Sequence, residues 1–197
     1  MKYNPDIHHR RSIRLKDYDY SQAGAYFVTI CTQNRECMFG DIVGGEMRLN
    51  DAGCMITRWW EKISTKFSTV ETDVHIIMPN HFHGIISIVG AALCGCPSMK
   101  GNRPLKNKDN IINNTQNTGH PRGGAPTLCD VMDWFKTMTT NEYIAGVKQN
   151  GWARFNGKFW QRNYYEHIIR SEPELHKIRE YIVNNPLNWE TDENFKN

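Results

Sequence analysis

Apolar and polar positions divide the chain into segments typical of strands and helices, separated by polar turns. Runs rich in β-branched and aromatic residues are typical of strands. Such runs predict strands at 25–34, 72–78, 81–89 and 158–170. A short hairpin is expected where residues 40–43 and 46–49 flank Gly44-Gly45.

Three helices are predicted where apolar residues recur at helical spacing behind a polar cap. Their expected caps are Asn50 or Asp51, Thr127 with Asp130 as its partner, and Ser171. The third helix is expected to end near Asn184, because Pro186 disfavours helical geometry at the residue before it. This order of elements predicts an α+β domain with helices on one face of a mainly antiparallel sheet.

Composition limits the class of protein. The chain has 197 residues, 39% of them hydrophobic, which is enough for the core of one domain. No apolar run approaches the ~20 residues of a membrane span, and no apolar signal segment follows the polar start. We therefore expect a cytoplasmic protein with reduced cysteines and no membrane partner. Residues at about 90–126 lack periodic apolar positions and are expected to form a flexible insertion.

The net charge of +3 permits a nucleic-acid partner without requiring one. Basic side chains gather in an N-terminal arm, residues 1–22, whose expected DNA-binding members are Arg10, Arg11, Arg14 and Lys16. The alternative is an ordinary solvated surface. Arg162 and Arg170 form a second basic group, interleaved with aromatic residues. That stretch either stacks bases and holds phosphates or packs into the core as a buried strand.

His81 and His83 form the best local signal for chemistry, in the run MPNHFHG at 78–84. Side chains two apart on a strand face the same way, so the two imidazoles make half of a metal site. Phe82 then points to the opposite face, towards a core. Gly84 would leave room for a ligand to approach closely. The alternative is a pair of ordinary surface histidines.

Tyr181 is the second signal, because it lies four residues before Asn185 on the last predicted helix. The two side chains therefore neighbour each other at the rim of an apolar stripe. A phenol can act as a covalent nucleophile once it is activated, and the Asn185 amide oxygen can bind a metal. The alternative is a boundary tyrosine whose ring packs and whose hydroxyl reaches water.

Four segments in a fixed order carry a resemblance to a known family. They are AYFVTI at 25–30, MPNHFHG at 78–84, WQRNYYEHIIR at 160–170 and YIVNNP at 181–186. Together they resemble the single-tyrosine HUH transposases, in the branch associated with repetitive extragenic palindromes (REP-associated tyrosine transposases). The resemblance covers about residues 12–189, apart from the insertion.

This resemblance implies a ferredoxin-like catalytic domain at 23–189, followed by a tail at 190–197. His81 and His83 match the metal pair of the family, and Tyr181 matches its nucleophile. Asn185 matches the position that completes the metal site, where many relatives have glutamine. The basic arm matches the region that helps to recognise DNA beside a hairpin. Tyr164 and Tyr165 lie outside the nucleophile position of the family.

The expected function is therefore metal-dependent cleavage and joining of single-stranded DNA at hairpin-forming repeats, through a 5′-phosphotyrosine intermediate. The expected cofactor is Mg²⁺ or Mn²⁺, the expected partner is single-stranded or hairpin DNA, and the protein acts as a monomer or a homodimer. Two alternatives remain. Lys177, near Tyr181, keeps open a replication-initiator or relaxase nuclease. A non-catalytic module that binds single strands would need neither the metal nor Tyr181.

Overall fold

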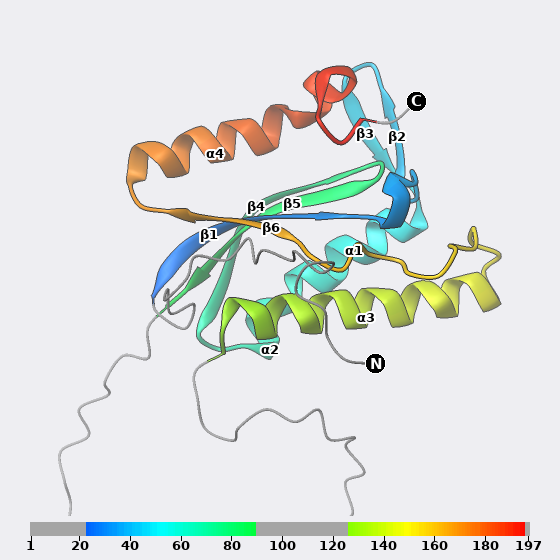
Figure 1. The fold of residues 1–197 in the computed structure, drawn as a ribbon, viewed down its shortest axis with the longest axis horizontal. Coiled ribbons are helices and arrows are strands. Elements are labelled where there is room, and N and C mark those ends of the chain that lie inside the picture. The colour runs from blue at the N-terminus through cyan, green and yellow to red at the C-terminus, as the bar shows by residue number, and fades with distance from the viewer. Residues whose placement is uncertain (1–22, 90–125, 196–197) are drawn as a thin grey trace, which may run out of the picture.

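A computed structural model describes residues 23–89 and 126–195 (Figure 1). The basic arm and almost all of the insertion at about 90–126 lie outside the described residues. Four antiparallel strands form the main sheet, in the order β4-β5-β1-β6. They are β1 (Gly24–Cys31), β4 (Val70–Met78), β5 (His81–Ile88) and β6 (Tyr165–Ile169). The sheet confirms the prediction of a mainly antiparallel α+β domain.

Two crossing helices make this sheet ferredoxin-like. Helix α1 (Asp51–Glu61), followed by the short α2 (Ile63–Lys66), connects β1 to β4. Helix α3 (Leu128–Gln149) lies between β5 and β6 in the chain. Both crossing helices pack on one face of the sheet, where they bury the larger hydrophobic cluster (Figure 1).

The expectation that all helices cover one face is wrong for the last helix. Helix α4 (Glu172–Asn184) lies on the opposite face, where Ile182, Leu175 and Ile178 join Phe27 and Ile85 of the sheet in a second cluster (Figure 1). The physical reason is that the central strands carry apolar residues on both faces, so each face needs a cover. The ferredoxin-like core thus has one extra helix on its second face.

The predicted helix caps are confirmed. Asn50 accepts a hydrogen bond from the Gly53 amide, and Thr127 forms a capping box with Asp130. Ser171 caps α4, and the helix ends at Asn184 as expected. The chain then continues in a 3₁₀ helix, η2 (Asn185–Thr191).

The predicted hairpin, β2 (Gly40–Val43) and β3 (Glu46–Leu49), is also confirmed. Its turn uses Gly44 and Gly45 at φ 63° and 80°, backbone angles that glycine adopts without steric cost. The hairpin lies beside η2, where Leu187 packs against Gly45 (Figure 1). A second 3₁₀ turn, η1 (Gln33–Arg35), follows β1 directly.

The predicted strand at 158–170 is only partly correct, because the regular ladder begins at Tyr165. Trp160 makes one isolated bridge to Thr32, and its indole nitrogen donates to Thr139 on α3. The Lys136 ammonium donates to the backbone oxygens of residues 161 and 162. Tertiary contacts with α3 therefore replace the ladder in this stretch.

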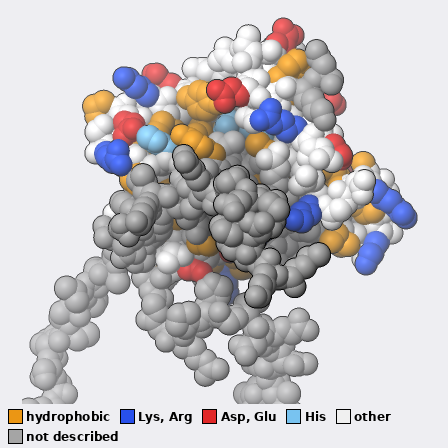
Figure 2. All heavy atoms as spheres, in the orientation of Figure 1, with side chains coloured by type: hydrophobic (Ala, Val, Ile, Leu, Met, Phe, Trp, Pro, Cys, Tyr) orange, Lys and Arg blue, Asp and Glu red, His pale blue; other side chains and the backbone are white. Residues whose placement is uncertain are grey.

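The aromatic residues of 158–170 serve mainly to pack the core. Trp160 and Tyr164 are buried in the larger cluster, whereas Tyr165 is exposed on the α4 face of the sheet. Arg162 and Arg170 are both exposed. Figure 2 shows the basic side chains on the visible described surface scattered among acidic ones. Within residues 23–89 and 126–195, no helix is long and apolar enough to cross a membrane.

Gly84 leaves no room for a ligand, contrary to the expectation from sequence. A Cβ at this position would lie 2.6 Å from Trp60 Cζ2 and 2.8 Å from Phe82 Cζ. The glycine therefore serves the packing of Trp60 against the sheet.

Gly84→Ala is expected to lower the free energy of unfolding by about 1–3 kcal/mol, because two rigid rings would have to move. Denaturant unfolding monitored by circular dichroism measures the loss. Gly24→Ala is the matched control in the same sheet, since a Cβ there would meet its nearest neighbour at an ordinary 3.6 Å. Equal stabilities of the two variants would contradict this account of Gly84.

Candidate active site

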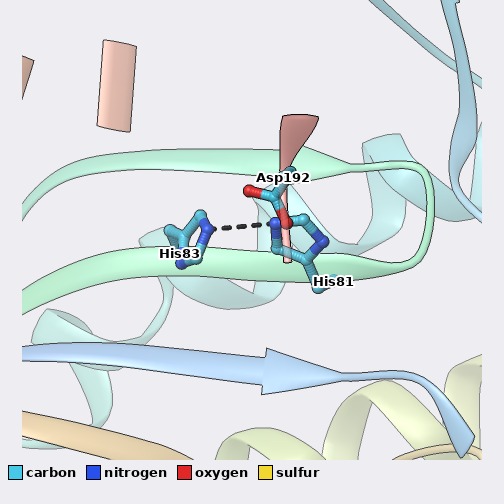
Figure 3. A group of neighbouring side chains, drawn as sticks. All are labelled: His81, His83 and Asp192. Carbon is cyan, nitrogen blue, oxygen red and sulfur yellow. Dashed lines mark hydrogen bonds between the residues drawn. The ribbon is translucent and has the colours of Figure 1, made fainter. Parts of the chain in front are cut away.

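The two histidines of β5 face each other under helix α4. Both imidazoles are buried, and His81 Nε2 lies 3.0 Å from His83 Nε2 (Figure 3). Phe82, between them, points into the larger cluster on the opposite face. The predicted alternation along this strand is therefore confirmed, and the surface-histidine alternative is wrong.

A separate partner holds each imidazole by its other nitrogen. Thr29 Oγ1 on β1 lies 2.7 Å from His83 Nδ1, and Asn80 Oδ1 lies 2.8 Å from His81 Nδ1. Phe27 stacks on the His83 ring at 5.4 Å between centroids, and Trp189 of η2 lies 5.9 Å from the His81 ring. These contacts fix both ring planes with their Nε2 atoms directed at each other.

Both imidazoles are held neutral by their surroundings. Burial lowers the pKa of His81 to about 3, and the nearby Arg35 guanidinium acts in the same direction. Burial likewise lowers the pKa of His83 to about 3, assisted by the neighbouring His81. Only a neutral imidazole offers a nitrogen lone pair to a metal ion, so the pair is in the state that metal binding requires.

Helix α4 brings Tyr181 to this pair. Its hydroxyl oxygen lies 3.5 Å from His83 Nε2, and its ring packs edge-on against Phe27 at 6.0 Å. The residue as a whole is 46% exposed, so Tyr181 lies at the surface of the domain and not in its core. Partial burial raises the pKa of the phenol, which therefore keeps its proton at neutral pH.

Asn185 follows one turn after Tyr181, as the sequence spacing predicted. Its side chain is buried close to the Tyr181 hydroxyl and the His81 ring. Its Nδ2 donates to Asp192 at 3.3 Å, while its Oδ1 has no hydrogen-bond partner among the described residues. A buried amide oxygen without a partner carries a free-energy cost that a bound cation would remove.

Asp192 is the site residue that sequence reasoning missed. The ligand atoms of His81, His83 and Asp192 all lie within 4.8 Å of one another, and Figure 3 shows the carboxylate directed at the His81 ring. The segment at 190–197 was expected to be a tail. The signal available in the sequence was Pro186 followed by Trp189, a turn and a large apolar residue that can fold the chain back.

These side chains form a donor set that fits a divalent cation. Two neutral imidazole nitrogens, one carboxylate and one unpartnered amide oxygen are a mixed N/O set. Arg162 and Arg170, predicted to bind DNA, have no contact with this group among the described hydrogen bonds. The other predicted DNA-binding residues, Arg10, Arg11, Arg14 and Lys16, lie outside the described residues.

Fold and site together define a ferredoxin-like domain with a candidate metal centre beside a tyrosine. No family model matches the chain. It is 43% identical over 196 residues to an uncharacterized protein of Haemophilus influenzae, and the match covers 98% of this chain and 96% of that protein. The chain therefore belongs to the same family as the H. influenzae protein.

A solved structure of a REP-associated tyrosine transposase bound to a REP hairpin is similar to this chain. The TM-score is 0.51 and the sequence identity is 16%, over 90% of this chain and 74% of that chain. At this identity the likeness shows a shared fold.

Proposed function

We propose that the protein is a metal-dependent endonuclease and strand transferase that acts on single-stranded DNA at hairpin-forming repeats. The observation that carries the proposal is the position of Tyr181, a partly exposed residue whose hydroxyl oxygen lies 3.5 Å from Nε2 of the buried His83. The fold shared with a transposase bound to a REP hairpin supports hairpin DNA as the substrate class.

Tyr181 is the proposed nucleophile. Its oxygen attacks the scissile phosphorus, and the bond to phosphorus forms as the bond from phosphorus to the 3′ oxygen breaks. The phenol gives up its proton and the departing 3′ oxygen takes one up. The products are a 5′-phosphotyrosine and a free 3′-hydroxyl. Attack by a different 3′-hydroxyl reverses the step and joins two strands without an external energy source.

His81, His83, Asp192 and Asn185 are the residues that would hold a Mg²⁺ or Mn²⁺ ion. When bound, the ion offsets the negative charge that builds up on the phosphate. The protein itself positions the nucleophile. Phe27 and His83 position the Tyr181 ring by edge contacts, and Tyr181 is partly exposed at the surface that DNA would approach.

Basic residues supply the proposed affinity for the DNA backbone. Phosphate contacts dominate single-strand affinity and make it depend on salt. Arg162 and Arg170 are exposed on either side of β6, where they remain available for such contacts. The N-terminal arm, with Arg10, Arg11, Arg14 and Lys16, is proposed to contact DNA beside the hairpin.

The proposal predicts a covalent adduct. Incubation with a labelled DNA hairpin that carries single-stranded flanks, plus Mn²⁺, is expected to give a protein–DNA species that survives denaturing electrophoresis. The label should show protein on the 5′ side of the break, and a polymerase should extend the released 3′ end. Tight binding of the hairpin with no adduct in either Mn²⁺ or Mg²⁺ would contradict the proposal in favour of a non-catalytic binding module.

A further inference from the structure

Asn80 is a fully buried residue at the turn between β4 and β5, directly before the first histidine. Its Nδ2 donates to two backbone oxygens, that of Arg35 at 3.2 Å and that of Asn194 at 2.8 Å. Its Oδ1 lies 2.8 Å from His81 Nδ1. The amide thus connects the η1 turn, the C-terminal segment and a histidine of the site.

The two carbonyl partners determine which way the Asn80 amide points. Carbonyl oxygens only accept hydrogen bonds, so the NH₂ group must face them and the amide oxygen must face His81. That oxygen accepts a hydrogen bond from Nδ1–H. The neutral ring therefore carries its proton on Nδ1 and its lone pair on Nε2, the nitrogen that faces His83.

The same NH₂ group anchors the segment that carries Asp192. Asn194 is bonded to Asn80 through its backbone oxygen, and the Arg35 guanidinium donates to the adjacent Glu193 oxygen. The Asn80 NH₂ group also holds the η1 turn, through its hydrogen bond to the Arg35 backbone oxygen. In this turn both Asn34 and Arg35 adopt left-handed backbone angles, φ 59° and 56°. Non-glycine residues persist in such angles only when surrounding contacts hold them there.

We infer that Asn80 is a positioning residue for the metal site, which sets the tautomer of His81 and holds the Asp192 segment in place. The inference rests on the metal centre of the proposed function. The turn between β4 and β5, where Asn80 lies, is held by a different contact. Thr32 donates to the backbone oxygen of Asn80 through both its amide and its hydroxyl. Changes to the Asn80 side chain therefore leave the turn with its backbone contacts.

Two variants separate the two roles. Asn80→Asp still offers His81 an acceptor oxygen, but it cannot donate to the carbonyl of Asn194. Asn80→Ala loses both functions. In the metal-free protein, ¹⁵N chemical shifts of the His81 ring report its tautomer, and hydrogen exchange of residues 192–195 reports the anchoring. Neither measurement requires DNA cleavage, so a failed adduct assay and a failed positioning role are distinguishable.

The expected result for Asn80→Asp is a retained Nδ1–H tautomer with faster exchange at 192–195. Asn80→Ala is expected to lose the Nδ1–H preference and to bind Mn²⁺ about 10–100-fold more weakly by electron paramagnetic resonance titration, the usual range for removing a residue that orients a ligand. Asn188→Ala is the matched control, because its exposed side chain donates to the backbone oxygen of Asn184 at the end of α4 and not to the site.

An Asn80→Ala protein with wild-type tautomer and Mn²⁺ affinity would overturn the inference. If Asn80→Ala shows no cooperative thermal unfolding, it is not folded and the Asn80→Asp variant tests both roles instead. Unchanged exchange protection at 192–195 in Asn80→Asp would then overturn the anchoring role, and loss of its Nδ1–H tautomer would overturn the acceptor role.

Discussion

Replacing Tyr181 by phenylalanine is expected to abolish the covalent protein–DNA adduct entirely while leaving the fold, Mn²⁺ binding and hairpin binding intact. The hydroxyl performs the proposed chemistry, whereas the ring performs the packing against Phe27. The residue is partly exposed, and its hydroxyl oxygen lies 3.5 Å from His83 Nε2, a long contact. Its removal should therefore change the free energy of unfolding by less than about 1 kcal/mol.

The matched control for this variant is Tyr165→Phe. Tyr165 also packs edge-on against Phe27, at 6.3 Å between centroids, and it lies on the same face of the sheet. In the ladder it pairs with Thr29, which pairs with His83. Two strand spacings, about 10 Å, thus separate its backbone from that of the histidine. Tyr165→Phe is expected to form the adduct at the wild-type level.

Tyr164→Phe should also form the adduct, because Tyr164 is buried in the cluster on the opposite face. Denaturing electrophoresis of the three variants, with circular dichroism as the check on folding, measures the outcome. Adduct formation by Tyr181→Phe would show that another residue is the nucleophile. Its loss in Tyr165→Phe, with Tyr181 intact, would point to Tyr165 instead.

Local sequence signals predicted most elements because their causes are local. The caps at Asn50, Thr127 and Ser171 depend on side chains within three residues of the helix start. The shared face of His81 and His83 depends only on the two-residue period of a strand. Tyr181 and Asn185 lie together because four residues span about one helical turn.

Contacts between distant segments explain what the sequence did not predict. The ladder begins late in 158–170 because the residues before it contact helix α3. Trp160 donates to Thr139 of that helix, and Lys136 of the helix donates to the backbone oxygen of residue 161. The room beside Gly84 is filled by Trp60, which lies 24 positions earlier in the chain by the sequence numbering. Asp192 reaches His81 because Asn80 and Arg35 bind the backbone of the segment after η2. No periodicity reports such contacts.

Replacing both His81 and His83 by alanine is expected to abolish metal binding and adduct formation together. Both nitrogens that face the proposed metal position are lost, and a lone carboxylate with an amide oxygen is a weak site for a divalent ion. Hairpin affinity measured without metal should change by less than about threefold, because phosphate contacts elsewhere supply most of it.

Metal binding can be measured without any DNA. A ligand that binds only the folded state stabilises it, by about 2.7 kcal/mol at one hundred times its dissociation constant. Wild-type protein should therefore unfold at a higher temperature with Mn²⁺ than without it, and the double variant should show no shift. His176→Ala is the control, because His176 is exposed on α4 and pairs only with Glu172 in its own helix. It should keep both the thermal shift and the adduct. A double variant that is still stabilised by Mn²⁺ would place the metal elsewhere and would remove the basis for a role of Asp192 and Asn185 in binding it.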